Sequence, residues 1–280
     1  MLRKNYNINN STHEIIRLDM RYREDVRNAP VVIICHGFKG FKDWGFFPHL
    51  SETLAEAGYV SISFNFSRNG IGADPQNFTE LDLFARNTYS HELEDLKCVI
   101  SSVRKGIIGK GVIDPDYIGL FGHSRGGGIA LLGASADSGI KVVVTWAAIS
   151  RIDRFGPDRM TRWKKEGFIE IENKRTRQLM RIERDLLEDI TTNAGRLNIT
   201  AAANRIKMPT LIIHGEKDDT VPINEAEAIY ESLASENKDY IVIEDGNHTL
   251  GITHPMTTRT PAYETALDLT ENWFDIHLNN

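Results

Sequence analysis

The sequence predicts an α/β protein with a doubly wound, mostly parallel β-sheet and helices on both faces. Short apolar, β-branched runs that end at glycine or polar residues alternate along the chain with longer stretches of helical period. The runs are apolar at consecutive positions, which is typical of parallel strands covered on both faces. A chain of 280 residues is long enough to bury a large core, and we expect a single domain over residues 1–280.

The expected strands each carry a continuous apolar run that closes on a turn. In chain order they cover residues 30–37, 59–66, 116–123, 140–148, 208–215 and 239–246. The segment HEIIRLDMRYRE, at residues 13–24, instead alternates between apolar and polar side chains. A period of two indicates a strand, and we expect an antiparallel edge strand there.

The segments between these strands have apolar residues at helical spacing. They cover residues 47–58, 89–106, 127–136, 224–236 and 262–278. A helix between two parallel strands returns the chain to the same edge of the sheet, and such crossovers are right-handed. The alternation therefore predicts repeated βαβ units.

Residues from about 151 to 205 interrupt this alternation. The segment contains no apolar strand run and is rich in charge, with helix-period sequence such as TRQLMRIERDLLEDI. It is too long for an ordinary loop, and its pattern is too regular for a disordered segment. We expect a helical cap, inserted in the same domain, that lies over one end of the sheet.

Composition and charge exclude several classes of function. The formal net charge is −6 and the pI is about 5.9, whereas a nucleic-acid surface needs concentrated basic residues, so no nucleic-acid partner is expected. No apolar run is long enough to span a membrane, and the polar N-terminus lacks the apolar segment of a secretory signal. We expect a cytoplasmic protein in which Cys35 and Cys98 are packed thiols; the sequence leaves open whether it forms a homo-oligomer.

The stretch GLFGHSRGGG, residues 119–128, places Ser124 in a Gly-x-Ser-x-Gly pattern. An expected strand enters the pattern and an expected helix leaves it, which is the context of a nucleophile elbow. Such a turn puts the serine in a strained backbone conformation, for which the neighbouring glycines leave room. The alternative is a serine that only caps the helix in a glycine-rich turn.

A serine hydroxyl needs a base, and the base needs a carboxylate that orients it. Later strand ends supply both residue types. TLIIHGEKDDTVP offers Asp218 and Asp219, and YIVIEDGNHTL offers His248 directly after the last expected strand, with His254 as the alternative. No histidines and acids have a convincing spacing for a metal site.

The order serine, acid, histidine is that of the α/β-hydrolase fold, and the chain resembles this superfamily from HGFKGFKDWG to GNHTL. HGEKDDTVP is similar to the family's H-G-x-x-D-x-x-V-P loop, which implies that Asp218 is the acid and Asp219 a turn residue. GNHTL resembles the histidine loop. Asn65 stands where many relatives carry aspartate. Within the superfamily, the chain most resembles bacterial cinnamoyl and feruloyl esterase-like enzymes and the catalytic domains of prolyl oligopeptidase-like enzymes.

The resemblance implies a carboxylesterase-type serine hydrolase that works through Ser124, His248 and Asp218 and an acyl-enzyme, without metal or other cofactor. Two backbone amides are expected to stabilise the oxyanion. One is the amide of Arg125, which directly follows the nucleophile. The other, by resemblance, is the amide of Phe38 in the loop after the first central strand.

The expected partner is a small-molecule ester with a small acyl or alcohol group, aromatic groups included. Cap side chains Trp163 and Phe168 are the candidates for binding it, although they equally fit an anchoring role between the cap and the domain. A peptidase or a thioesterase with the same triad remains an alternative. A further alternative is a binding protein of this fold that does not turn over a substrate. We expect no added propeller domain of the kind that screens peptides for such peptidases.

Overall fold

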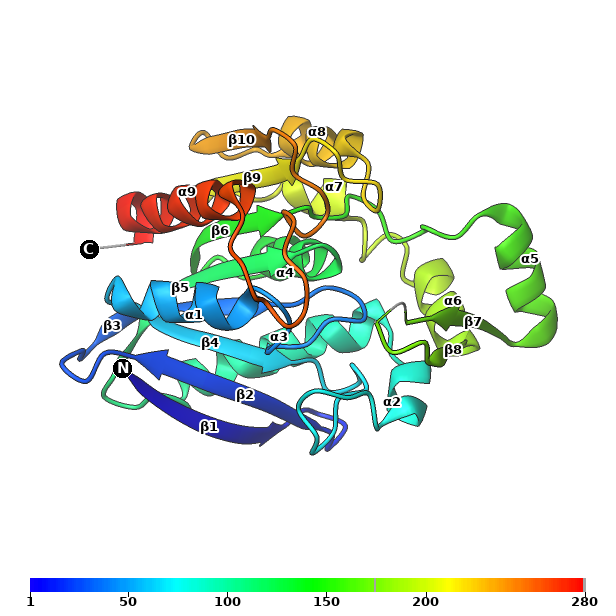
Figure 1. The fold of residues 1–280 in the computed structure, drawn as a ribbon, viewed down its shortest axis with the longest axis horizontal. Coiled ribbons are helices and arrows are strands. Elements are labelled where there is room, and N and C mark those ends of the chain that lie inside the picture. Colours follow the sequence, from blue (N-terminus) through cyan, green and yellow to red (C-terminus); the bar gives the residue numbers. More distant parts are fainter. Residues whose placement is uncertain (174, 279–280) are drawn as a thin grey trace.

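The computed structural model describes residues 1–173 and 175–278, and it has a central β-sheet with helices on both faces (Figure 1). The sheet has eight strands in the order β1-β2-β4-β3-β5-β6-β9-β10. The β1–β2 and β2–β4 pairs are antiparallel and the remaining pairs are parallel. The predicted doubly wound, mostly parallel sheet is confirmed.

The strands and helices of this domain occupy the expected segments with small shifts at their ends, except for β1, α2 and α7, which were not among the expected elements. The strands are β1 (Leu2–Asn9), β2 (Ile15–Tyr22), β3 (Ala29–Cys35), β4 (Val60–Asn65), β5 (Ile113–His123), β6 (Ile140–Trp146), β9 (Thr210–Gly215) and β10 (Lys238–Ile243). The helices are α1 (Phe47–Glu56), α2 (Leu81–Ala85), α3 (Tyr89–Arg104), α4 (Arg125–Ala136), α7 (Ile199–Ala203), α8 (Ile223–Ser232) and α9 (Pro261–Leu278).

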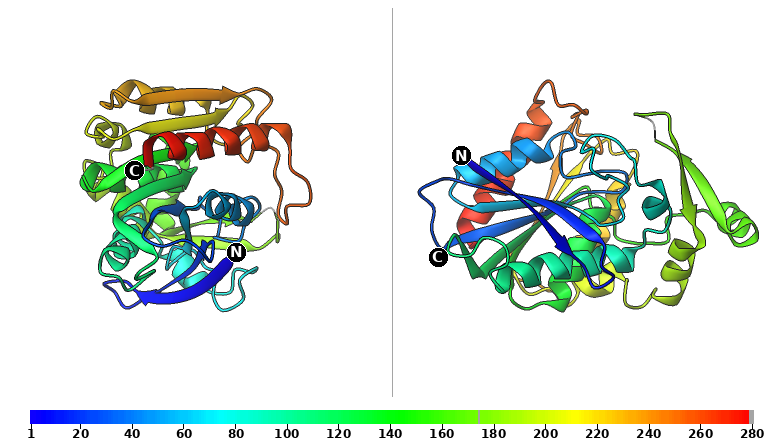
Figure 2. Two further views of the ribbon diagram at one scale, coloured as in Figure 1. Left: turned by 90° about the vertical axis from the view of Figure 1, so that its left-hand side faces the viewer. Right: turned by 90° about the horizontal axis from the view of Figure 1, so that it is seen from below.

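The sheet separates two apolar cores, and strand β3 contributes to both. Val31 and Ile33 face the core that includes side chains of α3 and α4, whereas Val32 and Ile34 face the core that includes side chains of α1 and α9. Figure 2 shows these two pairs of helices on opposite faces of the sheet. Because successive side chains of a strand point to opposite faces, burial on both faces requires an apolar run without alternation.

The N-terminal part of the sheet differs from the expectation. Residues 13–24 do form an antiparallel strand, β2, but β1 lies outside it and is the edge of the sheet. The sequence of β1, LRKNYNIN, is mostly polar, and only Tyr6 and Ile8 are half-buried against the core. A strand that buries so little apolar surface produces only a weak periodic signal.

The cap is only partly helical, so the expectation of an all-helical insertion is wrong. It contains α5 (Pro157–Glu166), a hairpin of β7 (Phe168–Glu172) and β8 (Leu179–Glu183), and α6 (Arg184–Thr192). Figure 1 shows these elements beside the carboxyl ends of the central strands. FIEIE and LMRIE each alternate apolar and charged residues, and this period of two marks the hairpin. The longer segment TRQLMRIERDLLEDI, which contains LMRIE, has a helical period, and this period predicted a helix instead.

The glycine at position 126 allows helix α4 to pack against the end of strand β3. A Cβ atom at Gly126 would lie 2.4 Å from the carbonyl oxygens of both Cys35 and His36, which are backbone atoms that cannot rotate away. We expect Gly126→Ala to destabilise the protein by about 1–3 kcal/mol, as overpacking does. Urea denaturation followed by circular dichroism measures this change.

Gly195→Ala is the matched control, since a Cβ at Gly195 would meet nothing within 4 Å. Its free energy of unfolding should stay within about 0.5 kcal/mol of the parent value. Equal effects of the two substitutions would contradict the close-packing argument.

Candidate active site

Ser124 lies in the turn between β5 and α4 in a strained backbone conformation. Its φ is 57° and its ψ is −122°, a combination that is costly for any residue with a side chain. The Ser124 amide donates a 2.8 Å hydrogen bond to the carbonyl oxygen of Trp146, and the Ser124 carbonyl accepts from the amide of Gly127 at 3.0 Å. These bonds hold the turn so that the hydroxyl stands at the carboxyl edge of the sheet.

The structure brings His248 and Asp218 to this serine. His248 Nε2 lies 3.1 Å from Ser124 Oγ, and His248 Nδ1 lies 2.8 Å from Asp218 Oδ2. An ionised carboxylate can only accept, so the proton of the neutral imidazole is on Nδ1 and Nε2 accepts from the serine hydroxyl. A nucleophile, a base and an orienting acid are therefore joined by hydrogen bonds, although they come from three distant segments of the chain.

The side chain of Asp218 is fully buried and its oxygens are saturated with donors. Oδ1 accepts from the amides of Thr220 at 2.8 Å and Val221 at 2.9 Å, while Oδ2 accepts from His248. Burial by itself raises the pKa of Asp218, but the hydrogen bond and charge of His248 and the two amide hydrogen bonds outweigh it and hold the pKa below its usual value. Asp218 is therefore ionised at neutral pH.

The two residues that the sequence left as alternatives lie in other environments. Asp219 is exposed and accepts a hydrogen bond from Thr220 Oγ1 at 3.1 Å. His254 accepts from the amide of Gly45 and pairs with Gln76. Neither is bonded to Ser124 or to His248 among the residues that the structure describes.

His123, directly before Ser124, supports the main chain of His248. Its Nε2 donates a 2.8 Å hydrogen bond to the His248 carbonyl oxygen, and the two rings lie with centroids 4.8 Å apart. Burial, with the neighbouring His248 as a smaller cause, lowers the pKa of His123 to about 3. A neutral His123 therefore fixes the loop from which the base projects.

Phe38 and Arg125 are both residues of the cavity that opens beside Ser124. Within the described part of the chain, no acceptor for either amide is seen. The Arg125 guanidinium lies above the rings of Tyr89, at 3.9 Å, and Phe38, at 5.2 Å, and its Nε bonds to buried Glu92 at 2.7 Å. The side chain of Arg125 thus packs the Phe38 loop next to the serine.

Asn65 helps to hold the same loop, although the sequence comparison marks it as a departure from aspartate. Its Oδ1 accepts from the amide of Lys42 at 2.8 Å, and Lys42 Nζ bonds to buried Asp19 at 2.9 Å. An amide oxygen can accept this bond as a carboxylate would. The substitution therefore preserves the anchoring of the loop.

The cavity beside Ser124 has a volume of about 600 Å³. Neither Trp163 nor Phe168 lines it: Trp163 is buried inside the cap against Phe155, and Phe168 lies under the guanidinium of Arg181. The structure does not support these two as substrate-binding residues, because α5 buries Trp163 inside the cap and Phe168 lies on the face of the hairpin opposite Ile171. Phe155 and Ile171 provide the apolar cap surface of the cavity instead.

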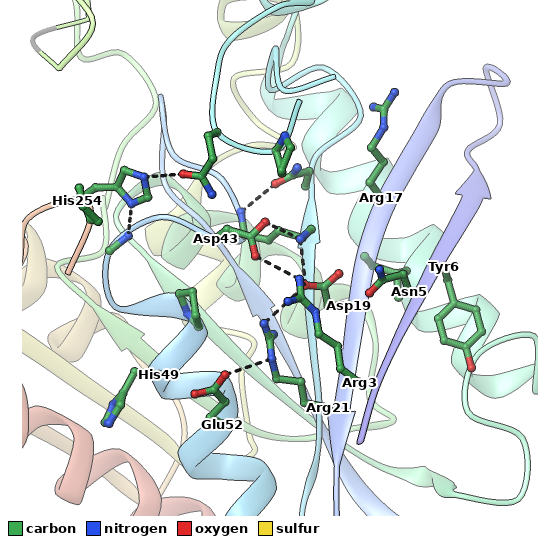
Figure 3. A pocket seen from close by; sticks show the side chains of 18 of the residues that line it. Arg3, Asn5, Tyr6, Arg17, Asp19, Arg21, Asp43, His49, Glu52 and His254 are labelled. Atoms are coloured by element: carbon green, nitrogen blue, oxygen red, sulfur yellow. Dashed lines mark hydrogen bonds and ion pairs between the residues drawn. The ribbon is translucent and has the colours of Figure 1, made fainter. Parts of the chain in front are cut away.

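A second cavity, of about 750 Å³, lies between the β1–β2 edge and the start of α1 (Figure 3). It is lined by charged side chains that are paired with one another. Arg3 and Lys42 bond to Asp19, Arg21 lies between Asp19 and Glu52, and Arg17 pairs with Glu80. We interpret it as a structural ion network that ties β1 and β2 to the loop before α1.

Residues 1–173 and 175–278 contain neither a metal-binding cluster nor a membrane-spanning helix. No group of three or more histidine, cysteine, aspartate or glutamate side chains there is placed to hold a metal ion. No helix in that part of the chain combines the length and the apolar character needed to cross a bilayer.

Comparison with known proteins places this geometry in a family. The family model described as BD-FAE matches residues 18–233. An uncharacterized 31.7 kDa protein of the traX-finO intergenic region of Escherichia coli is 23% identical and matches 95% of this chain and 97% of its own length. The uncharacterized peptidase YuxL of Bacillus subtilis is 26% identical over 89% of this chain, but over only 35% of its own length.

The solved structures show the same fold. Est1E from Butyrivibrio proteoclasticus, with ferulic acid bound, superposes with a TM-score of 0.73 at 18% identity and covers 96% of this chain and 99% of its own. At this level of identity, the likeness establishes the α/β-hydrolase fold and leaves the substrate of this chain undetermined.

The depressed pKa of His123 predicts how stability depends on pH. Between pH 6.5, its ordinary pKa, and about pH 3, the unfolded chain binds a proton at this imidazole that the folded chain does not. Stability therefore falls as the pH falls, by about 1.4 kcal/mol per pH unit from this group. We expect His123→Gln, which keeps an N–H donor, to reduce the slope of the unfolding free energy against pH by the contribution of one titrating group, about 1.4 kcal/mol per pH unit. Urea denaturation between pH 4 and 7 measures both curves, and parallel curves would refute the role of His123.

Proposed function

The chain belongs to the BD-FAE family of α/β hydrolases, and from that premise we propose that it is a serine hydrolase that cleaves carboxylic esters. The observation that carries the proposal is the connected geometry of Ser124, His248 and Asp218 at a strained strand-to-helix turn. A helix cap would explain the serine but would not need a histidine and a buried acid in line behind it. The cavity of about 600 Å³ supports a small-molecule ester as the substrate.

The first half of the proposed reaction forms an acyl-enzyme. Ser124 Oγ attacks the ester carbonyl carbon while His248 Nε2 takes the hydroxyl proton, and Asp218 stabilises the imidazolium. The negative oxygen of the tetrahedral intermediate accepts hydrogen bonds from the Phe38 and Arg125 amides. The C–O bond to the alcohol then breaks, and the alcohol leaves with the proton from His248.

The second half releases the acid. His248 takes a proton from water as the water oxygen attacks the acyl carbon, which forms a second tetrahedral intermediate at the same amides. Collapse of this intermediate breaks the bond to Ser124 Oγ, which recovers its proton from His248. None of these steps needs a group beyond the residues named.

We expect Ser124→Ala to lower kcat for p-nitrophenyl acetate hydrolysis by about 10⁴-fold or more with the fold retained, because the nucleophile is lost. Release of p-nitrophenol measures the activity, and circular dichroism verifies folding. A fluorophosphonate probe should label the parent protein at the peptide containing Ser124 and leave the variant unlabelled. Labelling at another residue would disprove the assignment.

Asp218→Asn is expected to lower kcat by about 10²–10⁴-fold, since the neutral amide no longer holds the correct imidazole tautomer or stabilises its charge. Asp219→Asn is the matched control: it makes the same chemical change one residue away on an exposed side chain and should keep full activity. Equal losses in the two variants would mean that the acid has been wrongly identified. A panel of peptide nitroanilides and thioesters, run with the parent protein, tests the peptidase and thioesterase alternatives.

A further inference from the structure

The cavity beside Ser124 is lined by cationic side chains and by no carboxylate among the described residues. The cations are Lys39, Arg125, Arg154, Arg159 and Arg175. A cavity with charges of one sign and low-dielectric walls concentrates the field of those charges on any ligand inside it. Acids behind the cavity wall can neutralise some of these cations and so reduce that field.

Two of the arginines are neutralised and held by buried glutamates. Arg125 bonds to Glu92 at 2.7 Å. Arg154 is paired with Glu225 and also donates to the carbonyl oxygen of Thr220 at 2.8 Å. These two shape the wall and bring little net charge to it.

Arg159 and Arg175 differ from them, because no acidic side chain within the described ranges lies within 4 Å of either guanidinium. Arg159 is an exposed residue of α5. Arg175 lies in the turn between β7 and β8, where its Nη2 donates to the Gln76 carbonyl oxygen at 2.9 Å and its guanidinium lies 5.7 Å from the centre of the Phe41 ring. Arg175 is therefore held near the mouth of the cavity by neutral partners.

The second cavity differs from the one beside Ser124 in the pairing of its cations. Arg3, Arg17, Arg21 and Lys42 in its lining each have an acidic partner within 4 Å, and Figure 3 shows the partners of Arg3 and Arg21. The chain as a whole also has a formal net charge of −6. Arg159 and Arg175, both residues of the cap, thus bring positive charge to the entrance of the candidate active site without an acidic partner among the described residues.

We propose that the substrate is an ester that carries a carboxylate, which Arg159 and Arg175 bind while Ser124 attacks the ester carbonyl. The proposal rests on the proposed esterase function and adds the charge of its substrate. A planar guanidinium matches a carboxylate in geometry and stays charged at every relevant pH. A neutral ester gains nothing from these two side chains, so the same cavity discriminates between anionic and neutral esters.

Matched ester pairs test the proposal with the purified full chain. One pair has the charge on the alcohol side: 4-acetoxybenzoate and its methyl ester. The other has it on the acyl side: p-nitrophenyl hemiglutarate and p-nitrophenyl valerate. Each kcat/KM is divided by the rate of hydroxide-catalysed hydrolysis of the same ester, which removes differences in intrinsic reactivity. We expect the carboxylate to be preferred in at least one pair, mainly through KM, and the preference to weaken as salt is added.

The variants assign that preference to the cap. Arg159→Gln and Arg175→Gln should each lower kcat/KM for the preferred anionic ester by about two- to fivefold, as is usual for exposed ion pairs, and leave the neutral ester unchanged. Arg162→Gln is the matched control, because Arg162 lies on the same helix α5 but faces Glu166 at 3.4 Å and does not line the cavity. It should change neither ester.

The two members of each pair separate failure of this inference from failure of the esterase function. If neither neutral ester is hydrolysed and the fluorophosphonate does not react, the proposed function is wrong. If neutral esters are hydrolysed but neither anionic partner is preferred, the esterase assignment stands and the anionic substrate is overturned. The same conclusion follows if Arg162→Gln lowers the preference as much as Arg159→Gln and Arg175→Gln do.

Discussion

The strained backbone of Ser124 is the constraint on which the rest of the structure depends. A residue with a side chain holds φ 57° and ψ −122° only where the surroundings leave it no alternative. Here the surroundings are bare backbone: a Cβ at Gly122 would lie 2.4 Å from the Gly126 carbonyl oxygen, and a Cβ at Gly37 would lie 3.0 Å from Ser124 Cβ. The close approach of β3, β5 and α4 therefore creates the turn, the direction of the hydroxyl and the position of the amide that follows it.

Buried charges support the site around this turn. Glu92 and Glu225 hold Arg125 and Arg154 against the cavity wall, and Asp218 holds the imidazole of His248. Removing a charge from water costs free energy, and only well-placed partners offset this cost. The donors that surround each of these acids provide that offset. The result is a rigid wall in which the reacting groups are already in line and the loop of Phe38 is packed under a guanidinium.

The cap adds charge that the domain beneath it does not balance. Its helix α5 and its hairpin turn carry Arg159 and Arg175 to the mouth of the cavity, whereas the buried acids neutralise only the arginines of the wall. In the function that we propose, the domain provides the catalytic geometry and the cap selects the substrate. Selection by charge acts over a longer range than contact does, which suits residues at the mouth of a cavity.

The sequence by itself determined the alternation of strands and helices, the elbow at Ser124, and the choice of Asp218 and His248, which the structure joins by hydrogen bonds. These signals are local: an apolar run, a glycine spacing or a motif at a strand end is complete within about ten residues.

Only the tertiary structure decided which cap side chains face the cavity, that the cap contains a hairpin, that the polar segment LRKNYNIN is the edge strand, and which arginines find an acid. Those outcomes depend on pairings between segments far apart in the chain, such as Arg154 with Glu225, and a one-residue change of register reverses the face that a strand presents. Trp163 and Phe168 are apolar residues in the right segment, yet the packing of α5 buries Trp163 inside the cap, and the register of the hairpin places Phe168 on the face opposite Ile169 and Ile171.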